Sequence, residues 1–350
     1  MTFQLGVYSF GNTGGKGLGS TSQAIRDVLE AMKLAEEVGL DFFGVGEHHH
    51  EIMPISSPSS VLNAAAAVTT RIGLGSTVTV LATDDPVRVY QQHATAAALA
   101  PGRIEITAGR GSGTDSFPLY GYPLEERDSP YAAKLDLLLA VNAAERVTWD
   151  GPHRGLPLRD ALVVPRADPP LKIWLGSGGS PESSLRAGSL GVPIAYGILN
   201  NTAEHWASVA ASYREAGRRA GHDPAALEVS VAGHGFIGKD GRAAKDNFYR
   251  CESWVLRTVG RPVPDRAYFD ANYAPGGMVM VGDPSEIADR LIAFHRVLGH
   301  SRQILQMDLG GIPHREVLRS IELLGTEVAP KVRAELGGFS QSKHSPRRVQ

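Results

Sequence analysis

Short apolar segments, nearly all followed by stretches with helical spacing, recur along the whole chain. They begin near residues 3, 41, 72, 103, 171, 192, 228 and 303. This alternation builds a parallel sheet, because each helix carries the chain back to the start of the next strand. Eight such units predict a closed α/β fold, the (β/α)8 TIM barrel, with inserted segments around 108–130, 149–170 and 240–282. An open doubly wound sheet is the alternative. We favour the barrel because candidate site residues recur at strand ends, and closure would gather them around one mouth.

Composition narrows the class of protein. The chain has 350 residues, of which 42% are hydrophobic and 21% are charged, so it can bury a large core. A formal net charge of -2 gives no reason to expect nucleic acid or an anionic membrane as a partner. The single cysteine, Cys251, excludes an intrachain disulfide and a cysteine-rich metal site. Without an export signal or a membrane anchor, we expect a cytoplasmic protein with one domain over residues 1–335 and a disordered tail over 336–350.

The apolar segment 42–46 ends abruptly in Glu47, His48, His49 and His50. Such a run is typical of a buried parallel strand, whose carboxyl end is where ligands bind. Imidazole has a reference pKa of about 6.5 and can exchange protons near neutral pH. Glu47 and His48 are therefore candidate catalytic residues. The alternatives are a metal site of His48, His50 and a carboxylate, and a structural role for the imidazoles. On an extended strand, His49 would point away from both of its neighbours.

Two glycine-containing stretches are candidate anion sites. In the first, Arg110 is a fixed charge between glycines, where backbone can come close to a phosphate or carboxylate. The second stretch consists of Ser177, Gly178, Gly179 and Ser180. It joins a strand to a helix, so backbone N–H groups and the positive end of the helix dipole converge there. No acidic residue follows at the spacing of a dinucleotide site, and we therefore favour a mononucleotide phosphate over a plain turn.

Together these segments resemble the bacterial luciferase-like monooxygenase family, which are flavin-dependent barrel enzymes. The resemblance spans nearly the whole chain. It rests on Glu47-His48-His49, Asp85-Pro86-Val87-Arg88, Gly109-Arg110-Gly111, Ser177-Gly178-Gly179-Ser180 and the closing segment 321–330. It implies an FMN site in which Gly109, Arg110 and the 177–180 loop hold the phosphate. It also implies that Thr77 and Val78 pack on the isoalloxazine ring, with a non-proline cis peptide there, and that His48 is the base or proton donor.

The expected function is that of an FMN-dependent monooxygenase or a related oxidoreductase. Reduced flavin, supplied by NAD(P)H or a partner flavin reductase, and O2 would oxidise a small organic substrate. Such chemistry needs a dry pocket and a lid, for which segments 11–19 and 108–130 are candidates. The alternatives are deazaflavin (F420)-dependent hydride transfer and a flavin-binding barrel without turnover. No metal cofactor is expected. The alanine-rich helices predicted over 61–70 and 87–99 allow close approach and suggest a homodimer.

Overall fold

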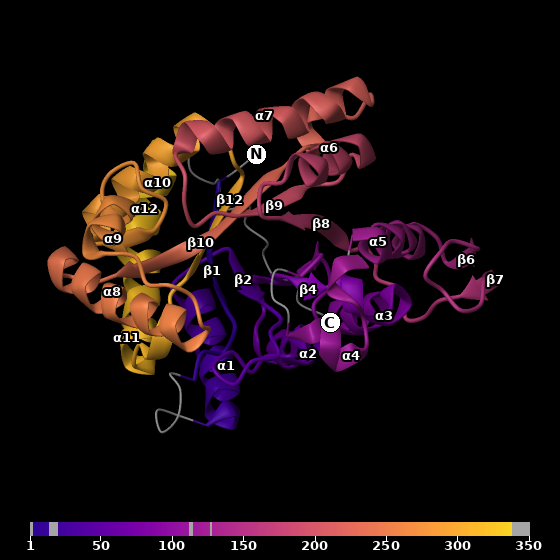
Figure 1. Ribbon diagram of the computed structural model, residues 1–350, viewed down its shortest axis with the longest axis horizontal. Helices are drawn as coiled ribbons and strands as arrows, with labels where there is room; N and C mark the ends of the chain where they lie inside the picture. The colour runs from indigo at the N-terminus through magenta and orange to yellow at the C-terminus, as the bar shows by residue number, and fades with distance from the viewer. Residues whose placement is uncertain (1–2, 14–19, 112–114, 127, 338–350) are drawn as a thin grey trace, which may run out of the picture.

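The computed structural model describes residues 3–13, 20–111, 115–126 and 128–337. Within them, eight parallel strands form a closed ring (Figure 1). In ring order these are β1 (Gln4–Ser9), β2 (Phe42–Val45), β3 (Gly73–Ser76), β5 (Ile104–Gly109), β8 (Lys172–Ser177), β9 (Ile194–Gly197), β10 (Val229–Ile237) and β12 (Arg302–Gln306). The last strand pairs with the first, with Gln4 opposite Arg302. The predicted TIM barrel is confirmed, and this closing pair excludes the doubly wound alternative.

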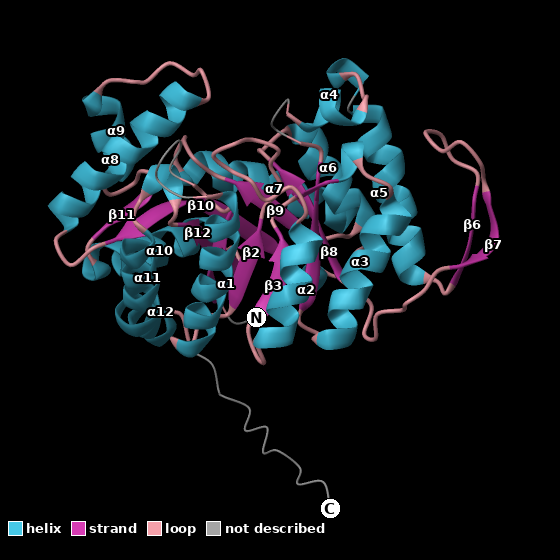
Figure 2. Cartoon of the chain, turned by 90° about the horizontal axis from the view of Figure 1, so that it is seen from below, coloured by secondary structure: helices cyan, strands magenta, loops and turns pink. Residues whose placement is uncertain are grey.

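Helices follow the strands and surround the ring (Figures 1 and 2). They are α1 (Thr21–Glu37), α2 (Pro58–Val68), α3 (Pro86–Leu99), α5 (Asp128–Ala143), α6 (Pro181–Leu190), α7 (Ala203–Arg219), α10 (Pro284–Leu298), α11 (His314–Leu323) and α12 (Ala329–Glu335). Several begin where the sequence provides a cap. At α3, the Asp85 side chain accepts the N–H groups of Val87 and Arg88, and Pro86 occupies the first turn. None of the described helices has the length and apolar character needed to cross a bilayer.

The inserted segments contain more regular structure than expected. Segment 149–170, predicted to be an insertion, includes the second strand of an antiparallel hairpin formed by β6 (Arg146–Trp149) and β7 (Leu158–Leu162). The hairpin stands apart from the barrel (Figure 2). The predicted insertion 108–130 holds α4 (Ser116–Tyr120). The predicted insertion 240–282 holds α8 (Gly241–Thr258), α9 (Arg266–Tyr273) and β11 (Met280–Gly282). Apart from α8, these elements are too short to show a clear hydrophobic period.

Side chains alternate between the lumen of the barrel and the helix layer. Tyr8, Phe42 and Ile304 form an inner cluster, whereas Val7 and Phe43 belong to the main core between strands and helices. This alternation follows from the period of two along a strand. It identifies which face of each strand looks into the lumen.

A charged layer crosses the lumen near the amino ends of the strands. Arg302 of β12 donates two hydrogen bonds to the Glu105 carboxylate of β5, at 2.6 and 3.0 Å. Trp174 Nε1 donates to the same carboxylate at 2.8 Å, and Gln4 accepts from Arg302. Burial opposes ionisation of Glu105, but the charge and hydrogen bonds of Arg302, together with the contributions of Lys172 and Trp174, outweigh it and lower the pKa of the carboxyl. Both charges are therefore paired inside the barrel.

Some sequence predictions concern residues that the structure does not describe. The tail predicted over 336–350 lies outside the described residues from position 338 onward. The lid candidate 11–19 is described only as far as residue 13, and the candidate 108–130 lacks residues 112–114 and 127.

Candidate active site

The residues selected from the sequence lie along one arc of the barrel rim. They follow or end β2 (Glu47, His48), β3 (Thr77, Val78), β5 (Gly109, Arg110) and β8 (Ser177 to Ser180). These four strands are consecutive neighbours in the sheet. Parallel strands place their carboxyl ends at the same edge, so the fold brings all of these segments to one side of the molecule.

His48 contacts a carboxylate that sequence analysis missed. Its Nδ1 lies 3.4 Å from Oδ2 of Asp115, and the same oxygen accepts the backbone N–H of His49 at 2.7 Å. The hydrogen bond with His48 is the main reason that the pKa of Asp115 lies well below its usual range. An ionised partner at Nδ1 favours the tautomer protonated there and leaves Nε2 as an acceptor. The Phe10 ring packs edge-on against the imidazole, with centroids 4.6 Å apart.

The Glu47 carboxylate bonds to groups other than His48. Its Oε1 lies 3.0 Å from His49 Nε2, and its Oε2 accepts the N–H of Val80 at 2.8 Å. The Glu47 N–H donates to the Val78 carbonyl. Burial raises the pKa of Glu47, while the bonds from Val80 and His49 act in the opposite direction. Glu47 thus ties the segment after β3 to the histidine loop, an arrangement that favours a positioning role over direct proton transfer.

The three histidines have three different surroundings. His48 contacts Asp115, His49 contacts Glu47, and His50 Nδ1 accepts the N–H of Ile52 at 3.3 Å. Strand β2 ends at Val45, so the expected alternation along an extended strand does not apply to this loop. Among the described residues, side chains at metal-binding spacing are Asp27, Glu30 and His314 rather than the histidines of this loop.

The strand predicted to begin near residue 72 is interrupted at the rim. The Thr77–Val78 peptide bond is cis, as the family resemblance implies, and the short strand β4 (Thr79–Val80) follows it. A Cβ added to Gly109 or Gly176 would lie 2.4 or 2.9 Å from a Val78 methyl, and one added to Gly44 would lie 2.6 Å from Thr77. One glycine on each of three strands, β2, β5 and β8, therefore leaves room for the Thr77–Val78 segment. The buried Thr77 Oγ1 has no hydrogen-bond partner among the described residues.

The 177–180 segment turns from β8 into α6. Ser177 Oγ accepts the N–H of Gly179 at 3.0 Å, and Ser180 caps the helix by accepting an N–H three residues on. Gly179 has φ +94° and an added Cβ would lie 2.7 Å from the Trp206 ring, so this position requires glycine. A Cβ on Gly178 would meet nothing within 4 Å. The turn thus leaves open space beside the positive end of α6.

Arg110 lies next to this turn. Ala108 pairs with Leu175 across β5 and β8, so Arg110 and Ser177 each lie two residues further along neighbouring strands. The Arg110 guanidinium forms an ion pair with Asp128, and the two side chains are 37% and 70% exposed. Exposed ion pairs contribute little to stability, so the guanidinium is available to a stronger anion. Among the described residues, one arc thus combines a cation, a helix N-terminus and a hydroxyl without a hydrogen-bond partner, a set of groups that suits an anionic ligand.

A second polar cluster lies across the rim. His234 of β10 has its Nδ1 3.3 Å from Glu252 of α8, and the Tyr273 hydroxyl of α9 donates to the same carboxylate at 2.7 Å. Burial, followed by the charge of Glu252, raises the pKa of Tyr273. His234 lies on the strand predicted to begin near residue 228. Sequence analysis missed Glu252 and Tyr273, because both belong to an insertion with no recognisable spacing to the strand.

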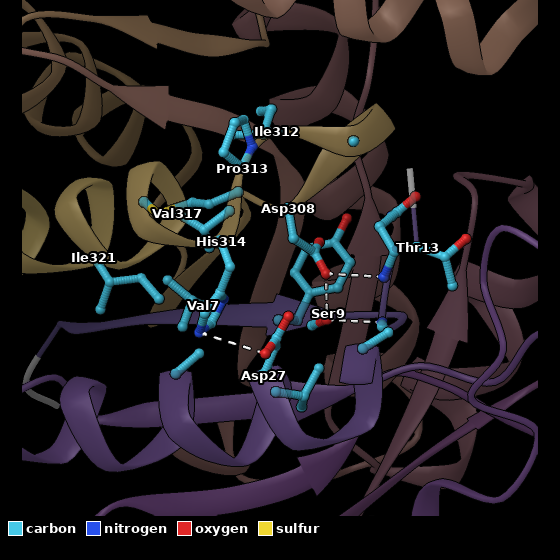
Figure 3. Close-up of a pocket in the computed structure, with 18 of the residues that line it drawn as sticks. Val7, Ser9, Thr13, Asp27, Asp308, Ile312, Pro313, His314, Val317 and Ile321 are labelled. Carbon is cyan, nitrogen blue, oxygen red and sulfur yellow. Dashed lines mark hydrogen bonds and ion pairs between the residues drawn. The ribbon is translucent and has the colours of Figure 1, made fainter. Parts of the chain in front are cut away.

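The carboxyl ends of β1 and β12 border a pocket of about 250 Å³ (Figure 3). At its rim the Ser9 hydroxyl and the Asn12 N–H donate to the Asp308 carboxylate. Burial raises the pKa of Asp308, and the Ser9 hydroxyl works against that rise. At another part of the pocket, His314 lies 3.9 Å from Asp27. Figure 3 shows α11 side chains on one side and the rim loop on the other.

Comparison with known proteins identifies relatives along most of the chain. A family model described as luciferase-like monooxygenase matches residues 4–301. The 4-hydroxyprotoasukamycin monooxygenase of Streptomyces nodosus subsp. asukaensis is 27% identical over 341 residues, which cover 90% of this chain and 88% of that protein. The F420-dependent glucose-6-phosphate dehydrogenase of Beutenbergia cavernae is 35% identical over 176 residues, covering 48% of this chain and 51% of that protein.

Solved structures have the same fold. The monooxygenase RslO1 from Streptomyces bottropensis superposes with a TM-score of 0.84 at 22% identity, covering 93% of this chain and 99% of that one. The oxygenating constituent of 3,6-diketocamphane monooxygenase from Pseudomonas putida, solved in complex with FMN, gives 0.75 at 18% identity, covering 95% and 99%. At these identities the likeness establishes the barrel architecture.

Proposed function

Because this chain belongs to the luciferase-like monooxygenase family, we propose that it is an FMN-dependent monooxygenase acting on a small organic substrate. In such a reaction one oxygen atom of O2 enters the substrate and the other leaves as water. Reduced flavin provides the two electrons, and NAD(P)H or a partner reductase regenerates it. The observation that carries the proposal is the arc formed by Arg110, the 177–180 turn, the segment after β3 and His48.

The residues of the arc have separate tasks in this proposal. Arg110 and the start of α6 hold the phosphate, and Thr77 and Val78 support the ring. Glu47 fixes the ring-supporting segment through the Val80 N–H. When bound, FMN supplies the redox chemistry, including the reaction of its reduced form with O2.

His48 is the acid-base group of the proposed site. Its Nδ1 faces the Asp115 carboxylate, which holds the imidazole in one tautomer. Its Nε2 then accepts a proton from the substrate or returns one. The edge-on contact with Phe10 restricts the imidazole ring further and helps exclude water from it.

Binding of FMN and riboflavin tests the phosphate assignment. Replacing Arg110 by Ala should weaken FMN binding at least tenfold, or about 1.4 kcal/mol, because a charge-assisted contact is lost. Riboflavin lacks the phosphate, so its affinity should hardly change. Fluorescence titration of the purified chain measures both. Arg146→Ala is the matched control, since Arg146 also forms an exposed ion pair with an aspartate but lies in the β6–β7 hairpin. Equal losses for the two ligands would remove the assignment.

A second candidate function is F420-dependent hydride transfer to or from a small organic substrate. It is favoured by the similarity to the F420-dependent enzyme from Beutenbergia cavernae. The proposed anion site suits either cofactor, because both carry a phosphate. Protection against thermal unfolding by FMN or by F420, each at the same concentration, distinguishes the two functions. Stronger protection by F420 would replace the monooxygenase proposal.

We further propose a homodimer through α2 and α3. The exposed apolar side chains there are Ala64, Ala67 and Val68 of α2 and Ala98 and Leu99 of α3. Other alanines of these helices, such as Ala65 and Ala94, are buried inside the subunit. Val68→Glu combined with Leu99→Glu should convert a dimer to monomers in sedimentation velocity, and a monomeric parent chain would refute this interface. A cytoplasmic location remains a proposal from the single cysteine.

A further inference from the structure

The pocket between α1 and α11 lies mainly in the helix layer. Val7 and Phe43 are register partners on β1 and β2, and both line the pocket. They belong to the main core, whereas their neighbours Tyr8 and Phe42 belong to the inner cluster. Tyr8 also contributes to the lining, but because side chains alternate along strands, the part of the pocket bordered by Val7 and Phe43 faces the outside of the barrel wall. The arc where we propose the flavin follows β2, β3, β5 and β8, and none of its residues is among those that line the pocket.

The walls of this pocket are apolar, and some of their residues are small. Ala24, Val28 and Ala31 of α1 line it together with Val317 and Ile321 of α11. The two alanines leave space between the helices. A volume of about 250 Å³ corresponds to about eight water molecules at ~30 Å³ each. A ligand of about eight to ten non-hydrogen atoms with an aliphatic body fits this space.

Asn12 gives the pocket a specific polar requirement. It lines the pocket, and both atoms of its side-chain amide are buried with no hydrogen-bond partner in the described part of the chain. Buried polar groups are nearly always satisfied, so this amide indicates a missing partner. Asn presents one acceptor and one donor group side by side. A carboxamide presents the complementary pair and can satisfy both atoms at once.

The charges around the pocket favour a neutral ligand. Asp308 already accepts from the Ser9 hydroxyl and from the Asn12 N–H. Asp27 lies near His314 at the other polar part of the lining. Two carboxylates beside an apolar space disfavour an anion, because a buried like charge is costly. Among groups that pair with both atoms of Asn12, the carboxamide is therefore favoured over the carboxylate.

The segment that carries Asn12 is hydrogen-bonded to the loop that carries His48. The Thr13 N–H donates to the Ile52 carbonyl at 3.2 Å, and the Ile55 N–H donates to the Phe10 carbonyl at 3.4 Å. The His48 N–H in turn donates to the Ile55 carbonyl at 2.9 Å. A ligand held by Asn12 would therefore sit on a segment that is in contact with the proposed active site.

We propose that this pocket is a second small-molecule site, which binds a neutral aliphatic carboxamide through Asn12. The proposal does not depend on the identity of the flavin or on turnover. Hexanamide, with eight non-hydrogen atoms, is a suitable probe.

Binding of hexanamide to the full chain, measured by ligand-observed NMR and calorimetry, tests the site. We expect saturable binding in the sub-millimolar range, and at least tenfold weaker binding of hexanoate. Asn12→Ala should weaken hexanamide binding about tenfold or more, and Ala24→Leu should abolish it by filling the space. Ala211→Leu, on the exposed face of α7, is the matched control and should bind as the parent does. FMN affinity should stay within twofold in all variants.

Several outcomes would overturn the proposal. One is the absence of saturable binding up to about 10 mM, far into the weak end of the affinity scale. Another is unchanged affinity in Asn12→Ala when circular dichroism shows that this variant is folded. Loss of hexanamide binding when FMN is saturating would assign the ligand to the flavin site instead. If Ala24→Leu does not fold, the comparison of hexanamide with hexanoate and the Asn12 variant still decide the question.

Discussion

His48 and Asp115 are 67 positions apart in the chain, yet their side chains meet at the rim. A carboxylate behind an imidazole fixes which ring nitrogen carries the proton, and so determines which one faces the substrate. The position of His48 at a strand end was predictable, because an apolar run stops there. Asp115 was not, since it comes from an inserted segment whose path no local pattern specifies. The bond from Glu47 to the Val80 N–H was equally unpredictable, because it depends on the interruption of a neighbouring strand.

Asp115→Asn tests this pair. We expect turnover to fall about tenfold or more, because a neutral amide can present either its oxygen or its nitrogen to Nδ1 and no longer selects one tautomer. FMN affinity should change less than twofold. Oxygen consumption with reduced FMN measures the rate, and ¹⁵N NMR of the imidazole reports the tautomer. Asp160→Asn, in the exposed hairpin, serves as control. An unchanged tautomer and an unchanged rate together would contradict this role.

The same substitution has an expected effect on acid stability. The folded-state pKa of Asp115 is lowered, so its ionisation stabilises the fold above the unfolded value of about 3.9 and loses this effect as pH falls further. The difference in melting temperature between parent and variant should therefore be present at pH 7. It should shrink as the pH falls below about 4. Thermal scans across this range check the direction.

At the level of elements, the rim is shaped by a break between β3 and β4 and by the glycines that border it. β3 stops at Ser76 and β4 resumes at Thr79, and glycines on β2, β5 and β8 border the gap. The order of strands and helices was predictable from hydrophobic spacing. The break was not predictable from spacing, because a segment rich in Val and Thr favours a continuous strand. Only the family resemblance indicated an unusual peptide there. The short elements of the insertions were missed because their sequences show no hydrophobic period.

Gly109→Ala tests the importance of this gap. The added methyl would lie 2.4 Å from Val78, so the segment must move, at a cost of about 1–3 kcal/mol. We expect FMN binding to weaken about tenfold, because the displaced segment is the proposed support of the flavin ring. Gly155→Ala is the matched control, since a Cβ there meets nothing within 4 Å. Fluorescence titration and chemical unfolding measure the two effects. Unchanged FMN affinity would mean that the ring lies elsewhere.

At the level of the whole molecule, the two ends of the barrel have different tasks. The amino ends hold the buried Arg302–Glu105 pair, and the carboxyl ends hold the candidate site. The barrel itself was predictable because the number of strand–helix units specifies closure. The cross-barrel pair was not, since Arg302 and Glu105 lie 197 positions apart on strands that are not neighbours, and no local pattern links them. In a shared fold of this kind, the choice of substrate depends on the inserted segments around the rim.

Glu105→Gln tests whether the buried pair stabilises the fold without affecting the candidate site. Removing the carboxylate leaves the Arg302 guanidinium, only 5% exposed, without its counter-charge, and we expect the free energy of unfolding to fall by about 3 kcal/mol. FMN affinity should stay within twofold, because the pair lies at the other end of the barrel. Guanidinium chloride unfolding and fluorescence titration test both statements. Glu215→Gln is the control, because Glu215 forms ion pairs at the surface of α7 and its loss should matter little.

The pairing of β1 with β12 also bears on how the protein is made. The two strands are separated by almost the entire chain, so a ribosome must deliver residue 302 before β1 gains its second neighbour. Until then one edge of β1 is unpaired, and its backbone N–H and C=O groups lack their partners in the sheet. Exposed edges of this kind attract other nascent chains. A slow codon shortly before β12 would therefore lengthen the interval in which molecular chaperones must shield the unpaired edge of β1. A truncation at the same point would leave this edge unpaired permanently.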